Sequence, residues 1–126
     1  MWFLKREEQR KLLALEMDYL RSTSVQITKK IPNTTIRSKM QAEQSILDRM
    51  QRRQLKWYGH LLRMEDSRWP KKIYQWTPHS RRRIGRPQKS WKNQVTNFMG
   101  SRNMVEDMAE DRNLWDLGID RRLLAE

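Results

Sequence analysis

The chain has 126 residues, which is enough for one domain, or for a small domain with an arm. It contains no Cys and only two His residues, His60 and His79, so disulfides are excluded and a metal site is not expected. The net charge of +12 predicts an anionic partner. No apolar run approaches the length of a membrane span, and the start MWFLKREEQR does not resemble a signal peptide, so we expect an intracellular protein.

Residues 1–44 are expected to form a connector made of a helix, a hinge and a short helix. Residues 5–21 are strong helix formers whose apolar side chains share one broad face. These side chains are Leu12, Leu13, Leu15, Met17, Tyr19 and Leu20. Residues 22–33 contain Pro32 and favour a loop, and a short helix over residues 34–42 follows, capped by Asn33 or Thr34.

A basic amphipathic helix is predicted from about residue 46 to residue 64, opened by the S-x-x-D capping pattern of Ser45 and Asp48. At 100° per residue, its cationic side chains cover roughly one third of the circumference. They are Arg49, Arg52, Arg53, Lys56 and Arg63, and the imidazole of His60 lies among them. The apolar side chains expected opposite them are Ile46, Leu47, Met50, Trp57, Tyr58, Leu61, Leu62 and Met64.

The cationic side of this helix has two interpretations, a solvated surface or a surface for nucleic-acid backbone. An ordinary exposed helix has acidic residues that form ion pairs four residues apart, and these are almost absent here. Residues 49–92 carry fourteen Lys and Arg against two acids, which favours a phosphate backbone. Gly59 inside the helix is consistent with close approach of a phosphate or with a packing requirement.

Residues 68–78 contain Trp69-Pro70 and Trp76-Thr77-Pro78, and a proline near each end predicts an extended segment or short edge strand. Its lysines, Lys71 and Lys72, are added to the candidate binding residues. The two tryptophans are interpreted as core anchors in preference to base-stacking platforms, because so polar a domain needs large side chains for burial. The tryptophans expected to meet in the core are Trp57, Trp69, Trp76, Trp91 and Trp115.

A basic loop over residues 79–86 then leads into a helix with Pro87 at its first position and Gly100 at its end. The buried side of this helix is expected to consist of Trp91, Val95, Phe98 and Met99. The loop brings cations to a helix N-terminus, which also favours an anion. The candidate phosphate-binding residues of this segment are Arg81, Arg82, Arg83, Arg86 and Lys89.

A last helix is predicted to begin at Asn103, with Glu106 three residues later, and to end at Gly118. Its buried stripe is expected to contain Met104, Val105, Met108, Ala109 and Trp115. The whole chain therefore predicts an all-α fold: a small irregular helical domain of four to five helices, with a Trp/Pro-containing extended turn and a basic loop. Residues 45–126 are expected to form the basic helical nucleic-acid-binding domain.

Four motifs follow one another in order: W-x-G-H-x-x-R-M at residues 57–64, W-x-P at 76–78, G-R-P-x-x-x-W at 85–91 and D-R-x-x-W at 111–115. This series resembles the region downstream of the reverse transcriptase domain in RTE-like non-LTR retrotransposons. The resemblance covers nearly the whole chain. It departs from the family where Ile84 interrupts an otherwise continuous R-R-R-G-R-P run.

The resemblance implies a non-catalytic segment that binds the RNA template or the target DNA, in the nucleus or in a cytoplasmic ribonucleoprotein. It also implies that residues 1–44 connect to an upstream polymerase thumb, and that the Y/F-x-D-D carboxylates and the endonuclease belong to upstream domains. No Y/F-x-D-D motif is present in this sequence. A truncated copy of such an element is also implied as a possible source of the chain.

Three functions from different classes follow from the sequence. The first is a sequence-tolerant module for DNA or RNA backbone. The second is an AT-hook-like arm, in which Gly85-Arg86-Pro87 enters the narrow minor groove of A·T tracts. The third is a protein-interaction segment or a truncated, non-catalytic fragment. An enzyme, a cofactor and a small-molecule substrate are not expected, because no nucleophile–base constellation or phosphate-cradling glycine loop is found.

Overall fold

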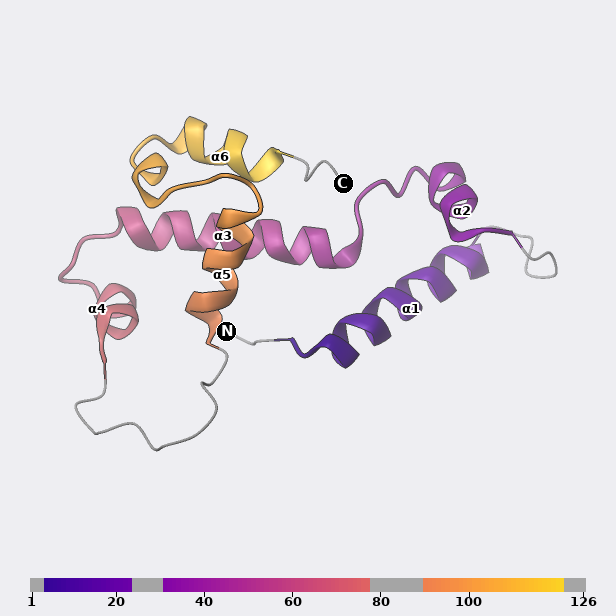
Figure 1. The fold of residues 1–126 in the computed structure, drawn as a ribbon, viewed down its shortest axis with the longest axis horizontal. Helices are drawn as coiled ribbons and strands as arrows, with labels where there is room; N and C mark the ends of the chain where they lie inside the picture. The colour runs from indigo at the N-terminus through magenta and orange to yellow at the C-terminus, as the bar shows by residue number, and fades with distance from the viewer. Residues whose placement is uncertain (1–3, 24–30, 78–89, 122–126) are drawn as a thin grey trace. The chain divides into compact units, whose positions relative to one another are not determined.

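Figure 1 shows the computed structural model, which describes residues 4–23, 31–77 and 90–121. All regular elements in these ranges are helical, so the predicted all-α fold is confirmed. The elements are α1 (Arg6–Thr23), α2 (Asn33–Lys39), α3 (Ile46–Arg63), α4 (Trp69–Gln75), α5 (Trp91–Gly100), the 3₁₀ helix η1 (Glu106–Ala109) and α6 (Arg112–Asp120).

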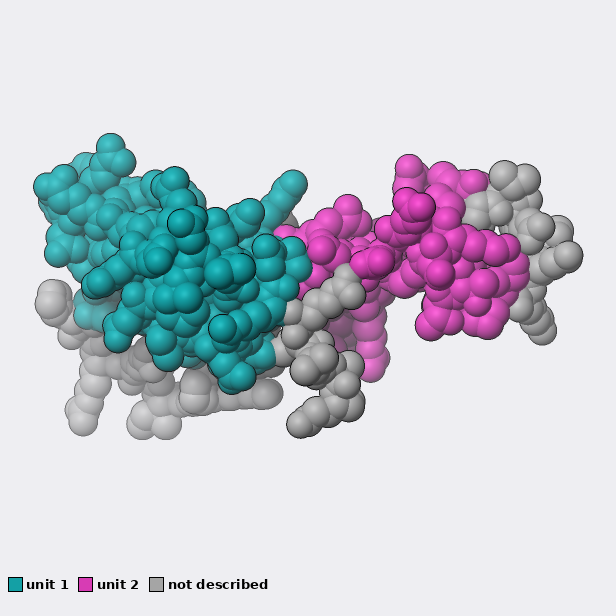
Figure 2. All heavy atoms as spheres, turned by 90° about the horizontal axis from the view of Figure 1, so that it is seen from above, with its two compact units in different colours: residues 1, 52–126 teal, residues 2–51 magenta. Residues whose placement is uncertain are grey.

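The chain divides into two compact units, coloured separately in Figure 2. The N-terminal unit consists of residues 2–51 and the C-terminal unit of residues 52–126. The division falls within α3, after Gln51. Each unit has a hydrophobic cluster of its own.

The N-terminal unit is built by α1 packing on α2. Its buried cluster consists of Met17 and Leu20 of α1 with Ile36 of α2. The prediction of a broad buried face on α1 is wrong for Leu15 and Tyr19, which are 65% and 67% exposed. The reason is that α2 is short and covers only a narrow stripe of α1. The α2 helix begins at Asn33 after Pro32, with no side-chain cap, so the predicted cap by Asn33 or Thr34 is wrong.

The C-terminal unit surrounds the second half of α3 with α5, η1 and α6 (Figure 1). The core residues of this unit are Leu55, Tyr58, Leu61, Val95, Met99, Met104, Ala109, Trp115 and Ile119. The indole Nε1 of Trp115 donates a hydrogen bond of 3.0 Å to the Leu55 carbonyl, which joins α6 to α3. The buried side of α3 therefore faces two later helices.

Residues 69–75 form helix α4, so the predicted extended segment is wrong here. Pro70 lies in the first turn, where its missing N–H would have no helical partner in any case. Backbone hydrogen bonds from Lys72 to Arg68 and from Trp76 to Lys72 continue the helix beyond the proline. Pro78 lies outside the described residues.

The last two helices also begin at different residues from those predicted. The Ser90 hydroxyl accepts a hydrogen bond from the Asn93 amide, so α5 begins at Trp91 and not at Pro87. Asn103 has a left-handed φ of 52° in a turn, so it does not cap a helix. The predicted single last helix is instead η1 followed by α6, whose N-cap is Asp111.

The end of the chain differs from the prediction in two further details. Val105, predicted to be buried, is 58% exposed, because it precedes η1 in extended conformation and does not belong to a helical stripe. The α6 helix continues through Gly118 to Asp120, since Gly118 is buried against the Met104 side chain and has no positive φ.

Candidate nucleic-acid interface

The cationic residues predicted on one helix do lie on a single helix, α3. Its N-cap is Ser45, whose hydroxyl accepts a 3.2 Å hydrogen bond from the Asp48 amide, as the capping pattern predicted. The helix runs from Ile46 to Arg63, one residue short of the predicted end. Asp48 in the first turn is the only acidic residue in α3.

Three of the predicted cationic or ionisable side chains on α3 are open to solvent. Arg53, Lys56 and His60 are exposed. They are spaced by three and four residues, so they share one side of the helix. In the described part of the chain, no carboxylate forms an ion pair with any of the three. This side therefore keeps its charge available for an external anion.

Trp57 lies next to these residues and not in the core. Its side chain is 40% exposed, and its ring centroid is 5.6 Å from that of His60. Trp57 is four residues after Arg53, about 40° around the helix, so it lies at the margin of the basic stripe, and the prediction that it lies opposite the cationic side chains is wrong. We call Arg53, Lys56, Trp57 and His60 the open face of α3. It lies within the C-terminal unit.

The remaining cationic residues of α3 make contacts within the protein. Arg52 bonds to the Asp120 carboxylate at 2.8 Å, and Arg63 donates to the Ala109 carbonyl at 2.8 Å. Both contacts hold α3 against the η1–α6 segment. The basic stripe therefore has two roles, with Arg52 and Arg63 stabilising the C-terminal unit.

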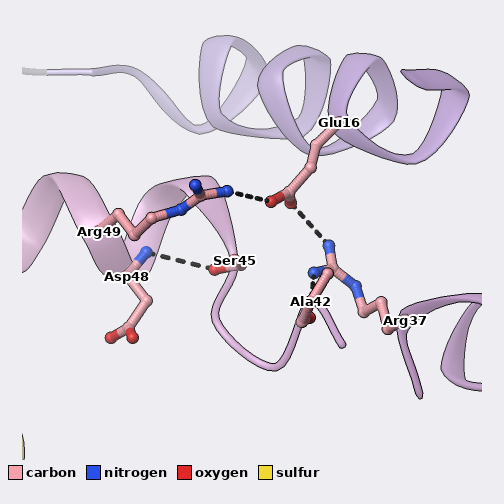
Figure 3. A network of polar contacts seen from close by, with 6 residues as sticks. All are labelled: Glu16, Arg37, Ala42, Ser45, Asp48 and Arg49. Carbon is pink, nitrogen blue, oxygen red and sulfur yellow. Dashed lines mark hydrogen bonds and ion pairs between the residues drawn. The ribbon is translucent and has the colours of Figure 1, made fainter. Parts of the chain in front are cut away.

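Arg49 belongs to the N-terminal unit, where it takes part in the network of Figure 3. The Glu16 carboxylate, whose side chain is only 7% exposed, binds Arg37 at 2.7 Å and Arg49 at 3.3 Å. Arg37 also reaches the Ala42 carbonyl at 3.5 Å. One buried carboxylate thus connects α1, α2 and the first turn of α3.

Of the two predicted lysines of α4, one makes contacts within the protein and the other is exposed. Lys71 donates to the Leu62 carbonyl at 2.6 Å and lies 3.7 Å from Asp66, so it fixes α4 to the end of α3. Lys72 is exposed, and its Nζ lies 5.6 Å from the Trp69 ring centroid. The predicted residues Arg81, Arg82, Arg83, Arg86 and Lys89 lie outside the described residues.

The five tryptophans do not meet in one core. Trp115 is 1% exposed and Trp91 packs at the core's margin, but Trp69 and Trp76 are 75% and 67% exposed. Tyr58, Trp115 and smaller side chains already fill this core, which leaves no volume for three more indoles. Sequence reasoning therefore missed three exposed tryptophans: Trp57 beside the basic stripe of α3, Trp69 in α4 and Trp76 at the end of α4.

Gly59 has a packing role. It is buried, and a Cβ added to it would lie 2.7 Å from Cδ1 of the Trp115 indole, closer than van der Waals contact. Because Gly59 has no side chain, the Trp115 indole can pack directly against the α3 backbone at this position. The indole occupies the space that a phosphate would need, so Gly59 is not part of a phosphate site.

A tyrosine pair fixes the side of α4 that faces α3. The Tyr58 hydroxyl lies 2.5 Å from the Glu106 carboxylate, to which it donates, and 3.0 Å from the Tyr74 hydroxyl. Burial, together with these hydrogen bonds to Glu106 and Tyr74, raises the pKa of the Tyr58 hydroxyl well above its ordinary value. Tyr58 therefore stays protonated at neutral pH and acts as a structural donor.

Neither a metal site nor a membrane-spanning helix is found in the described ranges. No group of three or more metal-ligating side chains lies close enough there to hold an ion. None of the helices in those ranges combines the length and apolar character that crossing a bilayer requires. Comparison of the chain with protein-family models, with curated proteins and with solved structures gave no match.

Proposed function

We propose that the chain is a nucleic-acid-binding module that holds the DNA or RNA backbone without reading base sequence. The observation that supports this most is the open face of α3. It presents Arg53, Lys56 and His60 to solvent on one side of a helix that contains no acid after Asp48. Charge of one sign that has no carboxylate partner among the residues that the structure describes suits the binding of a phosphate backbone.

The side chains of the open face suit phosphate in complementary ways. The planar guanidinium of Arg53 can donate two parallel hydrogen bonds to one phosphate, whereas the Lys56 ammonium acts as a compact charge. His60 adds a ring N–H donor. Trp57 offers a partly exposed indole beside them. Contacts of these groups to phosphate carry no sequence information, so the expected binding tolerates any sequence.

As part of this proposal, the chain derives from the C-terminal region of an RTE-like non-LTR reverse transcriptase, downstream of the polymerase domain. The support for this origin is the order of the four motifs, and residues of the first motif contact residues of the third and of the last. Gly59 from the first motif packs against Trp115 from the last. Trp91 from the third motif lies 6.0 Å from Tyr58, centroid to centroid. In this proposal the module is not itself catalytic, and its ligand is the RNA template or the target DNA.

Fluorescence-anisotropy titration of residues 1–126 tests the proposal. The ligands are a random-sequence duplex, an A·T-tract duplex and a single-stranded RNA, each at three salt concentrations. If six to eight phosphates are neutralised on the duplex, log K falls against log salt with a slope of about −5 to −7. A slope near −1 would contradict the proposal.

Two further outcomes separate the alternatives. A strong preference for the A·T tract that disappears in the Arg86→Ala variant would favour the AT-hook-like arm. Weak binding to every ligand, unchanged in an Arg53→Ala/Lys56→Ala variant, would favour a protein-interaction segment. The proposed module is instead expected to lose affinity in that double variant on all three ligands.

A further inference from the structure

Helix α4 has one side attached to the C-terminal unit and the opposite side open. Tyr74 and Lys71 make the attachments, to the Tyr58 hydroxyl and to the Leu62 carbonyl. Trp69 and Ile73 of α4 and Trp76, the residue that caps its C-terminus, follow at intervals of four and three residues and are expected on one side of the helix. Their exposed fractions are 75%, 69% and 67%. We call these three residues the open face of α4.

This open face is unusual for a small unit. Exposing two indoles to water is unfavourable, since each carries a large apolar area that burial would stabilise. An exposed contiguous apolar patch marks an interaction site. These side chains are mostly exposed, and the hydrogen bonds that attach α4 to the unit come from Tyr74 and Lys71.

The charge around this face specifies the partner's chemistry. Lys72 and Arg68 are exposed, and the Lys72 Nζ lies 5.6 Å from the Trp69 ring centroid. No acidic residue occurs in α4. The nearest preceding acid, Asp66, contacts Lys71 and Gln75, at 3.7 Å and 3.4 Å. A partner that fits must combine flat apolar groups with negative charge.

Resting on the proposed function, we infer that the open face of α4 stacks unpaired bases and gives the module a preference for single-stranded nucleic acid. Trp69 and Trp76 would each cover one base, while Lys72 and Arg68 bind the adjoining phosphates. Seven residues at about 1.5 Å rise place the Cα atoms of Trp69 and Trp76 about 10 Å apart along the axis, so the two side chains are expected to contact non-adjacent bases. In a duplex the base faces are covered by their neighbours, so this contact is lost.

The inference is tested by binding the full chain to a 12-nucleotide oligo(U) strand and to a random-sequence duplex. The test variant is Trp69→Ala/Trp76→Ala. Both side chains are mostly exposed, so the fold is expected to persist, which circular dichroism checks. Trp69→Phe/Trp76→Phe keeps aromatic rings. Leu117→Ala is the matched control, since Leu117 on α6 is 64% exposed but lies on a different helix.

The alanine variant is expected to bind oligo(U) at least about fivefold more weakly for each tryptophan removed, with duplex affinity changed less than twofold. The phenylalanine variant is expected to retain most of the single-strand affinity, and the Leu117 control all of it. Unchanged oligo(U) affinity in the alanine variant would overturn the inference and make α4 a protein-docking face. Equal losses on both ligands would also overturn it.

Failure of the proposed function has a different signature. In that case the wild-type chain would bind neither ligand with a steep salt dependence, and Arg53→Ala/Lys56→Ala would change nothing. If that double variant weakens binding to both ligands while the tryptophan variant weakens neither, backbone binding stands and base stacking is rejected.

Discussion

Replacing Gly59 by Ala tests whether Trp115 is seated directly against the α3 backbone. The added Cβ would approach the indole at 2.7 Å from Cδ1, a distance that real Cβ atoms do not show. Trp115 is 1% exposed and its Nε1 is bonded to the Leu55 carbonyl, so the ring cannot move without disturbing the core. Destabilisation is therefore expected, although alanine is the better helix former.

The magnitude follows from three contributions. Alanine in place of glycine inside a helix stabilises it by about 1 kcal/mol. Overpacking in a close-packed core costs about 1–3 kcal/mol. Displacement of the indole from the Leu55 carbonyl leaves a buried donor unpaired, which costs about 1–3 kcal/mol more. The free energy of unfolding is thus expected to fall by about 1–5 kcal/mol, since displacement of the ring accompanies overpacking.

The chain offers two matched controls for this substitution. A Cβ at Gly100, the last residue of α5, meets nothing within 4 Å, so Gly100→Ala is expected to be neutral or to stabilise by up to about 1 kcal/mol. At Gly118 the Cβ meets the flexible Met104 side chain at 3.0 Å, so an intermediate effect is expected. Urea unfolding monitored by circular dichroism gives all three values. A Gly59→Ala variant as stable as Gly100→Ala would refute the placement of Trp115.

Two other predictions concern buried polar groups, one in each unit. Because burial raises the pKa of the Tyr58 hydroxyl, the stability it contributes is complete below the unfolded value of about pH 10 and is lost as the pH rises further. Between pH 10 and 11 the wild-type unfolding free energy should fall more steeply than that of Tyr58→Phe, by up to about 1.4 kcal/mol per pH unit; parallel urea curves would contradict this. Glu16→Gln removes the charge that holds Arg37 and should speed amide exchange in α1 and α2 about tenfold without changing α6, as hydrogen-exchange mass spectrometry would show. Equal acceleration in α6 would contradict it.

Local sequence signals predicted those parts of the fold that depend on local physics. The Ser45 cap, the extent of α1 to within two residues at each end and the single basic helix follow from propensity, capping and periodicity. The α4 helix was mispredicted because a proline near a helix start was interpreted as a breaker. The last helix was mispredicted because Asp111 offers a better cap than Asn103, whose backbone is left-handed.

The candidate site was harder to predict because burial is decided by packing between distant segments. Arg52, Arg53 and Arg63 have similar positions in the sequence pattern, yet Arg52 meets Asp120 and Arg63 meets the Ala109 carbonyl. These partners lie dozens of residues away, and no helical wheel identifies them. The same limit applies to Trp69 and Trp76, since hydrophobicity alone does not show that the core is already filled.

The central claim is that the open face of α3 binds phosphate whereas the other arginines of the helix hold the fold. Its most direct test compares two double variants with equal loss of charge, Arg53→Ala/Lys56→Ala and Arg52→Ala/Arg63→Ala. The salt dependence of binding to a random-sequence duplex is measured together with the melting temperature. The first variant should reduce the slope by about 1.8, two phosphates at about 0.9 each, at an unchanged melting temperature. The second should lower the melting temperature and change the slope by well under 1. Equal slope losses in both variants would contradict the claim.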